Sequence, residues 1–199
     1  MRKAIEIIFI FVLCSLISSC IPALQNSLNA QPHFRKAWWG NTVEMIKFKE
    51  RDKTIHTRAN GALVYEIQYK GVPLLLVYCF SKELGTYRLK AAGYMTLEPQ
   101  AINEPDNVFR QELLKTLGEP TRTLQDGGMV WLGEESVVYT NAYHDSNDSN
   151  TQGWQLITGY IDRTFYEKIG ENQEKKRLYA GLTYYQQIFF GLFQRLQEP

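Results

Sequence analysis

The stretch LLLVYCF, residues 74–80, has an apolar or aromatic side chain at every position. Because successive side chains of a strand point to opposite faces of a sheet, a strand that is apolar throughout is covered on both of its faces. We therefore predict an interior strand here, bounded by turns at residues 70–71 and 81–85. Cys79 in this strand is predicted to be a small, buried hydrophobic side chain.

The segments on either side alternate apolar and polar residues, which is the period of a strand with one covered face. Residues 63–69 and 87–92 show this alternation and predict the two neighbouring strands. Upstream, Asn41 stands three positions before Glu44, so that each side chain can satisfy a free amide in the first turn of a helix. We expect a short helix over residues 42–50, and with it a first α-β-β-β unit over residues 34–100.

A second unit with the same order of elements is predicted at residues 101–162. Asp106 is the expected cap of its helix, whose apolar stripe comprises Phe109, Leu113, Leu114 and Leu117. Gly118 is expected to end this helix, with Pro120 just beyond it. Three extended segments complete the unit: MVWL (129–132), ESVVYTNAY (135–143) and WQLITGYI (154–161).

The two units have similar lengths, and short motifs recur at matching places. Residues 92–94, Ala-Gly-Tyr, correspond to residues 158–160, Thr-Gly-Tyr, and the pair Val77-Tyr78 corresponds to Val138-Tyr139. We interpret this as a tandem repeat. The predicted fold class is α+β, with two tandem α-β-β-β units that form antiparallel sheet, helices on one face of the sheet, and a C-terminal amphipathic helix.

The C-terminal segment, residues 163–199, is expected to be helical. Apolar residues recur at spacings of three and four, which is a heptad-like seam: Leu178, Leu182, Tyr185, Phe189, Leu192 and Leu196. Further aromatic residues widen this surface, so the helix must be buried against something. We favour packing over the open face of its own sheet. Docking to a partner and lying in a membrane interface are the alternatives.

The first residues have the pattern of a bacterial lipoprotein leader. Residues 1–19 combine a basic start with an apolar core that is too short to span a bilayer core of ~30 Å as a helix. Ile17 to Cys20 resemble the lipobox, in which a branched apolar residue and two small ones precede an acylated cysteine. We predict lipidation at Cys20 and a tether over residues 20–33. A soluble secreted protein or an uncleaved helical anchor is the alternative.

Composition limits the classes of function. Removal of the leader leaves 20 basic and 20 acidic side chains, because Arg2, Lys3 and Glu6 are lost from totals of 22 and 21. A chain without net charge is a poor general binder of nucleic acid, so no nucleic-acid partner is predicted. The predicted partners are the lipid bilayer, through acylated Cys20, and another envelope protein. In lipoproteins of double-membrane bacteria, aspartate after the acylated cysteine retains the protein at the inner membrane. Here Ile21 follows the cysteine, so the resemblance implies the outer membrane facing the periplasm, if the organism has one.

Residues suited to catalysis or metal binding are few. The histidines, His33, His56 and His144, have no second histidine or cysteine at ligand spacing. The polar loop at residues 145–150 offers oxygen ligands for calcium, but Asn150 and Leu156 stand where an EF-hand loop requires glycine and glutamate. We interpret this loop as a surface turn. No metal, cofactor or catalytic residue is predicted, and the protein is not expected to be an enzyme.

Aromatic residues are the candidates for binding a partner, because aromatic side chains dominate the hot spots of protein interfaces. Six are singled out, two before the first helix and four in the C-terminal segment: Trp38, Trp39, Tyr185, Phe189, Phe190 and Phe193. The alternative, which we favour for the aromatic residues as a group, is that they fill the core between helices and sheet. Trp38, Trp39, Trp131 and Trp154 belong to this group.

The run LLKTLGEPT (113–121), followed by Trp131, resembles the helix-to-strand junction of the BamE-like small lipoproteins of the outer-membrane β-barrel assembly machine. In that family a helix ends in Leu-Gly-x-Pro ahead of an antiparallel sheet, and the matching positions here are Leu117, Gly118, Pro120 and Trp131. The doubled plan also resembles β-lactamase inhibitor protein. WGNTVEMIKFKE (39–50) is similar to the first helix of uncharacterised bacterial lipoproteins. The assembly lipoproteins have one unit and no aromatic terminal helix, so their partner-binding residues are not carried over.

Taken together, these patterns favour a membrane-anchored cell-envelope lipoprotein that acts as a non-enzymatic protein-binding or scaffolding module, by analogy in envelope assembly. The alternative is an enzyme or small-ligand carrier with a pocket between the sheet and the C-terminal helix.

Overall fold

The computed structural model of the chain describes residues 33–59, 61–69, 71–96, 108–144, 154–171 and 189–190. All of them lie in the compact unit His33–Pro199. Among these residues, none of the helices combines the length and the apolar character that crossing a bilayer requires. The predicted leader and most of the predicted tether lie outside the described residues, as do the cap Asp106 and the polar loop at residues 145–150.

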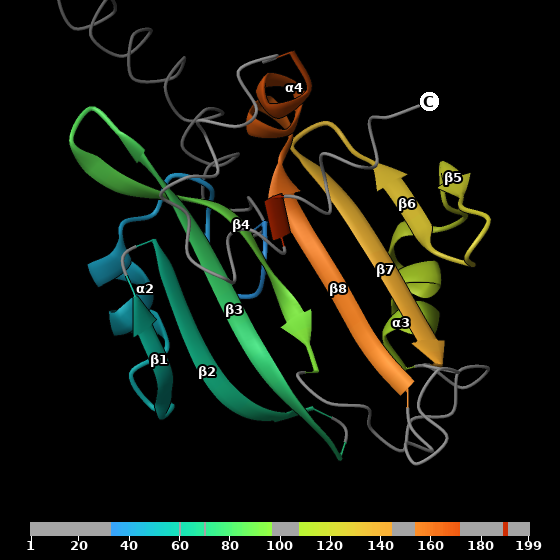
Figure 1. The fold of residues 1–199 in the computed structure, drawn as a ribbon, viewed down its shortest axis with the longest axis horizontal. Helices are drawn as coiled ribbons and strands as arrows, with labels where there is room; N and C mark the ends of the chain where they lie inside the picture. The colour runs from blue at the N-terminus through green and yellow to red at the C-terminus, as the bar shows by residue number, and fades with distance from the viewer. Residues whose placement is uncertain are drawn as a thin grey trace, which may run out of the picture. The chain divides into compact units, whose positions relative to one another are not determined.

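The described residues form one antiparallel sheet of eight strands, in the order β1-β2-β3-β4-β8-β7-β6-β5 (Figure 1). Each strand pairs antiparallel with its neighbours, so the predicted α+β class with antiparallel sheet is confirmed. The bounds are β1 (Ile55–Ala59), β2 (Ala62–Tyr69), β3 (Val72–Glu83), β4 (Thr86–Met95), β5 (Arg122–Thr123), β6 (Met129–Leu132), β7 (Ser136–His144) and β8 (Trp154–Asp162).

The stretch LLLVYCF lies within β3 and is an interior strand, as predicted. All seven of its side chains are buried, and β3 pairs with β2 on one side and with β4 on the other. Cys79 is fully buried, and burial raises the pKa of its thiol, so it behaves as the predicted small hydrophobic residue. The continuous apolar run is explained by packing on both faces of the sheet.

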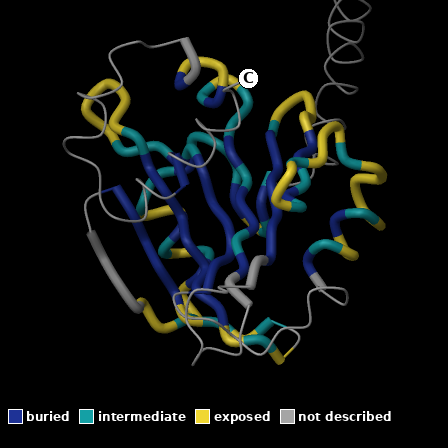
Figure 2. The backbone as a smooth tube through the Cα atoms, turned by 45° about the vertical axis from the view of Figure 1, so that its right-hand side comes forward, coloured by how far each residue is buried: buried dark blue, intermediate teal, exposed yellow. Residues whose placement is uncertain are grey.

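Helices α2 (Val43–Lys49) and α3 (Val108–Leu117) pack on one face of the sheet. Ile46 of α2 and Phe109 of α3 belong to the same core cluster on this face, where Phe109 stacks on Tyr69 at 4.7 Å between ring centroids. The predicted placement of both helices on one face is therefore confirmed. The central strands are buried along most of their length, and exposed residues gather in turns and on outer helix surfaces (Figure 2).

The opposite face of the sheet is covered by α4 (Arg163–Glu171) and by residues 189–190. Tyr166 and Ile169 of α4 share a core cluster with Phe189 and Phe190, and the ring of Phe165 meets that of Phe190 at 5.0 Å. Phe189 and Phe190 thus pack over their own sheet, which is the arrangement that we favoured for the C-terminal segment.

Strands β4 and β8 join the two halves of the sheet at a pair of glycines. Gly93 lies opposite Gly159 in this pairing. A Cβ atom at Gly93 would lie 2.1 Å from the carbonyl oxygen of Thr158 and 2.6 Å from Cε1 of Phe189. Only glycine fits at this position, because the neighbouring backbone and the Phe189 ring both approach closely.

Gly118 ends α3 as predicted. It adopts a φ of 76°, its N–H donates to the Leu114 carbonyl at 3.0 Å, and its own carbonyl accepts from Nε1 of Trp131 at 2.9 Å. The left-handed backbone favours glycine, and the indole satisfies a carbonyl that the helix leaves free. The predicted apolar stripe holds for Phe109 and Leu113, which are buried, whereas Leu117 is exposed.

Two local predictions are wrong, and two strands have no counterpart among the predictions. The cap of α2 is Thr42, whose Oγ1 accepts from the Met45 N–H, while the Asn41 side chain accepts from the Trp38 N–H instead. The turn after β3 is confined to Leu84-Gly85, because strand pairing continues to residue 83. Strands β1 and β5 were not predicted, since β1, IHTRA, is rich in polar residues and β5 has two residues.

Candidate functional site

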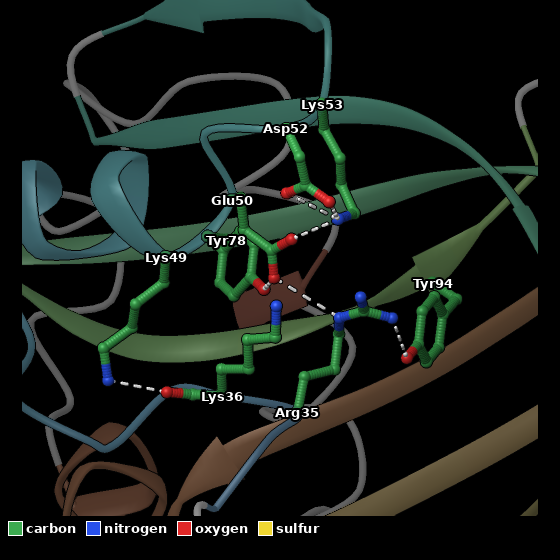
Figure 3. A network of polar contacts seen from close by, with 8 residues as sticks. All are labelled: Arg35, Lys36, Lys49, Glu50, Asp52, Lys53, Tyr78 and Tyr94. Atoms are coloured by element: carbon green, nitrogen blue, oxygen red, sulfur yellow. Dashed lines mark hydrogen bonds and ion pairs between the residues drawn. The ribbon is translucent and has the colours of Figure 1, made fainter.

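A buried carboxylate at the end of α2 organises a polar network that joins this helix to the sheet (Figure 3). Ile46 and Glu50 lie one helical turn apart on the inner side of α2, and both are buried. The Tyr78 hydroxyl of β3 donates to Oε1 of Glu50 at 2.6 Å. Nζ of Lys53 lies 2.9 Å from Oε2, and Nε of Arg35 lies 3.4 Å from Oε1. Both carboxylate oxygens are thus held by donors or cations.

Arg35 connects this carboxylate to the middle of the sheet. It lies in a tight turn in which the Ala37 N–H donates to the Phe34 carbonyl at 2.8 Å, and its own φ is 53°. A non-glycine residue in this left-handed region is strained, and surrounding contacts must hold it there. Here Nη1 of Arg35 donates to the Tyr94 hydroxyl at 3.3 Å, in addition to the contact with Glu50.

The electrostatics of the network keep every member in its ordinary charge state at neutral pH. Burial alone raises the pKa of Glu50, but the hydrogen bond from Tyr78 and the Lys53 and Arg35 cations outweigh it, so the pKa lies below its ordinary value. Burial, followed by the hydrogen bond to Glu50, raises the pKa of Tyr78. The phenol therefore remains protonated and donates to an ionised carboxylate.

These properties suit the network to fixing α2 in place rather than to proton transfer. A carboxylate with a lowered pKa is a weak base, and a phenol with a raised pKa is a weak nucleophile. A second contact anchors the same helix, because Nζ of Lys49 donates to the Lys36 carbonyl at 2.6 Å. Helix α2 is thus held at its carboxyl end by residues from the turn before it and from β3.

The outer surface of α2 differs from its inner surface. Met45 and Phe48, three positions apart and therefore neighbours on the helix, are 46% and 67% exposed. The Arg51 guanidinium lies over the Phe48 ring at 4.9 Å from its centroid. We call Met45, Phe48 and Arg51 the α2 outer face.

The chain around the α2 outer face is rich in positive charge. Residues 35–53 include six basic and three acidic residues, although the whole chain has a net charge of only +1. The basic residues are Arg35, Lys36, Lys47, Lys49, Arg51 and Lys53. The acidic ones are Glu44, Glu50 and Asp52. Arg35 and Lys53 contact the buried Glu50, and Lys47 pairs with Glu44, so the surplus belongs to the segment as a whole. On the α2 outer face itself, the Arg51 guanidinium lies beside the exposed apolar side chains.

The two predicted tryptophans lie before this helix and contact the start of the described chain. Trp39 stacks on His33, its Nε1 donates to Oγ of Ser136 at 2.9 Å, and its backbone N–H donates to Nδ1 of His33 at 2.9 Å. Trp38 meets the His33 ring edge-on at 5.1 Å. Trp39 therefore bridges two parts of the folded unit, and both indoles are only partly exposed.

The structure corrects the prediction that Phe189 and Phe190 contact a partner. Their side chains are 0% and 1% exposed, because they fill the face of the sheet opposite α2 and α3. Tyr185 and Phe193, the other two candidates of this segment, lie outside the described residues. Over the described ranges, no group of three or more His, Cys, Asp and Glu side chains is placed to hold a metal ion.

Sequence reasoning missed the residues that organise this site. Glu50 and Arg35 were not singled out, although Glu50 follows Ile46 by four positions and so falls on the buried side of the helix. That spacing is the one signal that was present. No sequence pattern predicts that Phe48 is exposed, because a phenylalanine at helical spacing is usually part of a core.

Replacing Glu50 by glutamine is expected to lower the free energy of unfolding by about 2 kcal/mol, because two cations lose their charged partner at a buried position. Urea denaturation followed by circular dichroism measures this. Glu44→Gln is the matched control, since Glu44 lies on the same helix with a side chain that is 78% exposed and pairs with Lys47. Its expected effect is below about 0.5 kcal/mol.

The difference in free energy of unfolding between wild type and Glu50→Gln is expected to depend on pH. Because the pKa of Glu50 is lowered in the folded protein, its stabilising contribution is complete above its ordinary pKa of 4.5 and is lost as the pH falls through the folded value. The difference between wild type and Glu50→Gln should therefore shrink as the pH falls below 4.5. A difference that stays constant on acidification would show that the charge of Glu50 is not what stabilises the fold.

Comparisons of the chain with protein-family models, curated proteins and solved structures give no significant match.

Proposed function

We propose that the protein is a lipid-anchored cell-envelope protein that acts as a binding or scaffolding module for another envelope protein. Cys20 carries the lipid, and residues 20–33 tether the folded unit to the bilayer. The leader pattern that ends at Cys20 supports the anchor. The protein performs no covalent chemistry in this proposal.

The single observation that carries the binding role is the α2 outer face. Phenylalanine, methionine and arginine are among the residue types enriched at protein interfaces, and here they adjoin one another on one exposed surface. The polar network around Glu50 holds this helix rigidly, which reduces the entropy lost on binding. Because this segment of the chain carries a surplus of positive charge, we expect the partner to present an apolar pocket bordered by carboxylates.

Two features of the site favour binding over the alternative of an enzyme or ligand carrier. The ionisable groups of the Glu50 network are paired with one another, with pKa shifts that oppose proton transfer. A pocket between the sheet and the C-terminal segment requires space, whereas the rings of Phe189 and Phe190 pack against the sheet there.

The tandem arrangement of two units is part of the same proposal. Each half has one helix followed by four strands, and the strand order reads the same from either edge when β1–β4 correspond to β5–β8. A local twofold axis requires equivalent residues to pair, and Gly93 pairs with Gly159. In this register Val77 corresponds to Tyr139 rather than to Val138, because these residues face the two glycines.

The C-terminal amphipathic helix is the remaining element of the proposal. Phe189 and Phe190 are in helical conformation and buried, and both belong to the predicted apolar surface of residues 178–196. We infer that this surface as a whole covers the sheet face opposite α2 and α3.

Crosslinking in intact cells tests the binding role. A photo-crosslinking amino acid at the exposed position of Glu44 is expected to capture a specific envelope protein. Replacing Met45 and Phe48 together by serine should reduce that product by about tenfold or more, since truncated hot-spot residues commonly cost more than 1 kcal/mol each. Because both side chains are exposed, the variant is expected to remain folded.

Leu117 and Leu132 provide the matched control, because each is 44% exposed and neither belongs to α2. Replacing both by serine should leave the crosslinked product unchanged. An equal loss in this control, or no loss in the Met45 and Phe48 variant, contradicts a binding role for α2. The anchor is tested separately by mass spectrometry of the mature protein, which should begin at Cys20 and carry acyl chains.

A further inference from the structure

The β3–β4 hairpin extends beyond the strands that flank it (Figure 1). β2 pairs with β3 only as far as Cys79, and β8 pairs with β4 only from Ala91. Beyond these points the two strands continue as a ribbon, whose last pair is Glu83 with Thr86. At about 3.4 Å per residue, four residues carry the end of β3 roughly 14 Å past its last pairing with β2.

The tip of this ribbon has a residue that neither the turn nor the core explains. Leu84 and Gly85 have φ values of 47° and 82°, which are those of a type I′ turn. Such turns favour asparagine or glycine at the first central position, and a leucine there is sterically strained. The Leu84 side chain is also fully exposed, at 107% relative exposure, so it makes no compensating contact within the described part of the chain. A strained and exposed leucine points to a contact outside the chain.

Charges next to the tip identify the kind of surface that it fits. Lys82 is exposed on the ribbon, opposite Tyr87. The carboxylate of Glu83 is not free, because Nζ of Lys90 lies 3.0 Å from it. An apolar tip beside an exposed cation matches the interface of a bilayer, where the apolar side chain enters the acyl region and the cation meets lipid head groups.

The ribbon also lies near the point where the chain enters the folded unit. The Asn41 carbonyl accepts from the Leu89 N–H at 2.9 Å, so the segment that leads from His33 into α2 runs beside the base of the ribbon. Twelve residues separate Cys20 from His33. A chain of this length reaches at most about 45 Å, which keeps an anchored unit close to the bilayer.

We propose that the Leu84 tip of the β3–β4 hairpin inserts into the surface of the bilayer to which the chain is anchored, and so fixes the orientation of the folded unit. This proposal rests on the proposed anchoring at Cys20. It assigns one contact to the bilayer and leaves the α2 outer face to a protein partner.

The test uses the mature chain, residues 20–199, with Cys20 coupled through maleimide to lipid in vesicles of phosphatidylcholine and phosphatidylglycerol. Coupling is selective over Cys79, which is fully buried. Hydrogen exchange of the hairpin amides, residues 81–87, is compared for the coupled and the free protein. Exchange should slow by about tenfold on coupling, because burial of a leucine side chain is worth roughly this factor or more.

Leu84→Asn separates membrane contact from hairpin stability. Asparagine suits the type I′ turn, so this variant should keep or increase its resistance to urea while losing the protection that coupling gives. Leu132→Asn, at a 44% exposed site in β6, should retain that protection. Protection in Leu84→Asn equal to that of wild type overturns the proposal, as does the absence of protection in the coupled wild type. Chemical coupling supplies the anchor, so failure here is distinguishable from absence of acylation in cells.

Discussion

Replacing Phe189 by alanine is expected to lower the free energy of unfolding by about 3–5 kcal/mol, which is a large part of the stability of a domain of this size. The ring is 0% exposed and lies against Gly93 in the centre of the sheet. Its removal leaves a cavity between α4 and the sheet, since Phe190 and Ile169 occupy the same cluster. Thermal or urea denaturation of the purified mature chain measures the loss.

Phe48→Ala is the control for this prediction, because Phe48 is 67% exposed and its loss should cost less than about 1 kcal/mol. Truncation after Lys176 extends the test to the whole segment. If residues 177–199 cover the sheet, the truncated chain should unfold or expose an apolar face that binds hydrophobic dyes. A truncated chain that stays fully stable and loses only a binding partner would instead make the segment a docking helix.

Gly93→Ala is expected to destabilise the fold by about 3 kcal/mol or more. The added methyl group would lie 2.1 Å from the Thr158 carbonyl oxygen, which belongs to the backbone of β8 and cannot rotate away. Strands β4 and β8 would have to separate where Gly93 pairs with Gly159, and this pairing joins the two halves of the sheet. A denaturant titration that follows tryptophan fluorescence reports the loss.

Two further variants show which contact is responsible. Gly85→Ala is expected to cost only about 1–2 kcal/mol, because nothing lies within 4 Å of its Cβ position and the strain comes from its φ of 82° alone. The double variant Gly93→Ala, Phe189→Ala removes the ring contact but keeps the clash with Thr158. Because the backbone clash remains, the double variant should be less stable than Phe189→Ala alone. A double variant as stable as Phe189→Ala would instead locate the conflict in the ring.

Much of the fold is predictable from local patterns, because burial imposes them directly. Continuous apolarity marks β3 as an interior strand, and Gly118 marks the end of α3 by its left-handed backbone. The cap of α2 was assigned one residue too early, since Asn41 and Thr42 are both good capping residues and only the contact with Trp38 decides between them. Edge strand β1 is not predicted by its sequence pattern. It pairs with only one neighbouring strand, so too little of it is buried to require regular alternation of apolar and polar residues.

The candidate site was less predictable, because its residues come from separate elements. Glu50, Arg35 and Tyr78 meet through the packing of a helix, a turn and a strand, and no spacing in the sequence links them. The aromatic residues illustrate the same limit. Phe48 and Phe189 are alike as residues, yet one is exposed on α2 and the other is buried against the sheet.

Local sequence patterns predict most of the secondary elements, the interior position of β3 and the α+β antiparallel class, because hydrophobic periodicity and turn residues act locally. The order of the strands, the pairing of Gly93 with Gly159 and the burial of particular aromatic side chains emerge only in the folded protein. These depend on contacts between residues far apart in the chain. The free energy of such contacts comes from shared burial and complementary shape, which no single segment encodes.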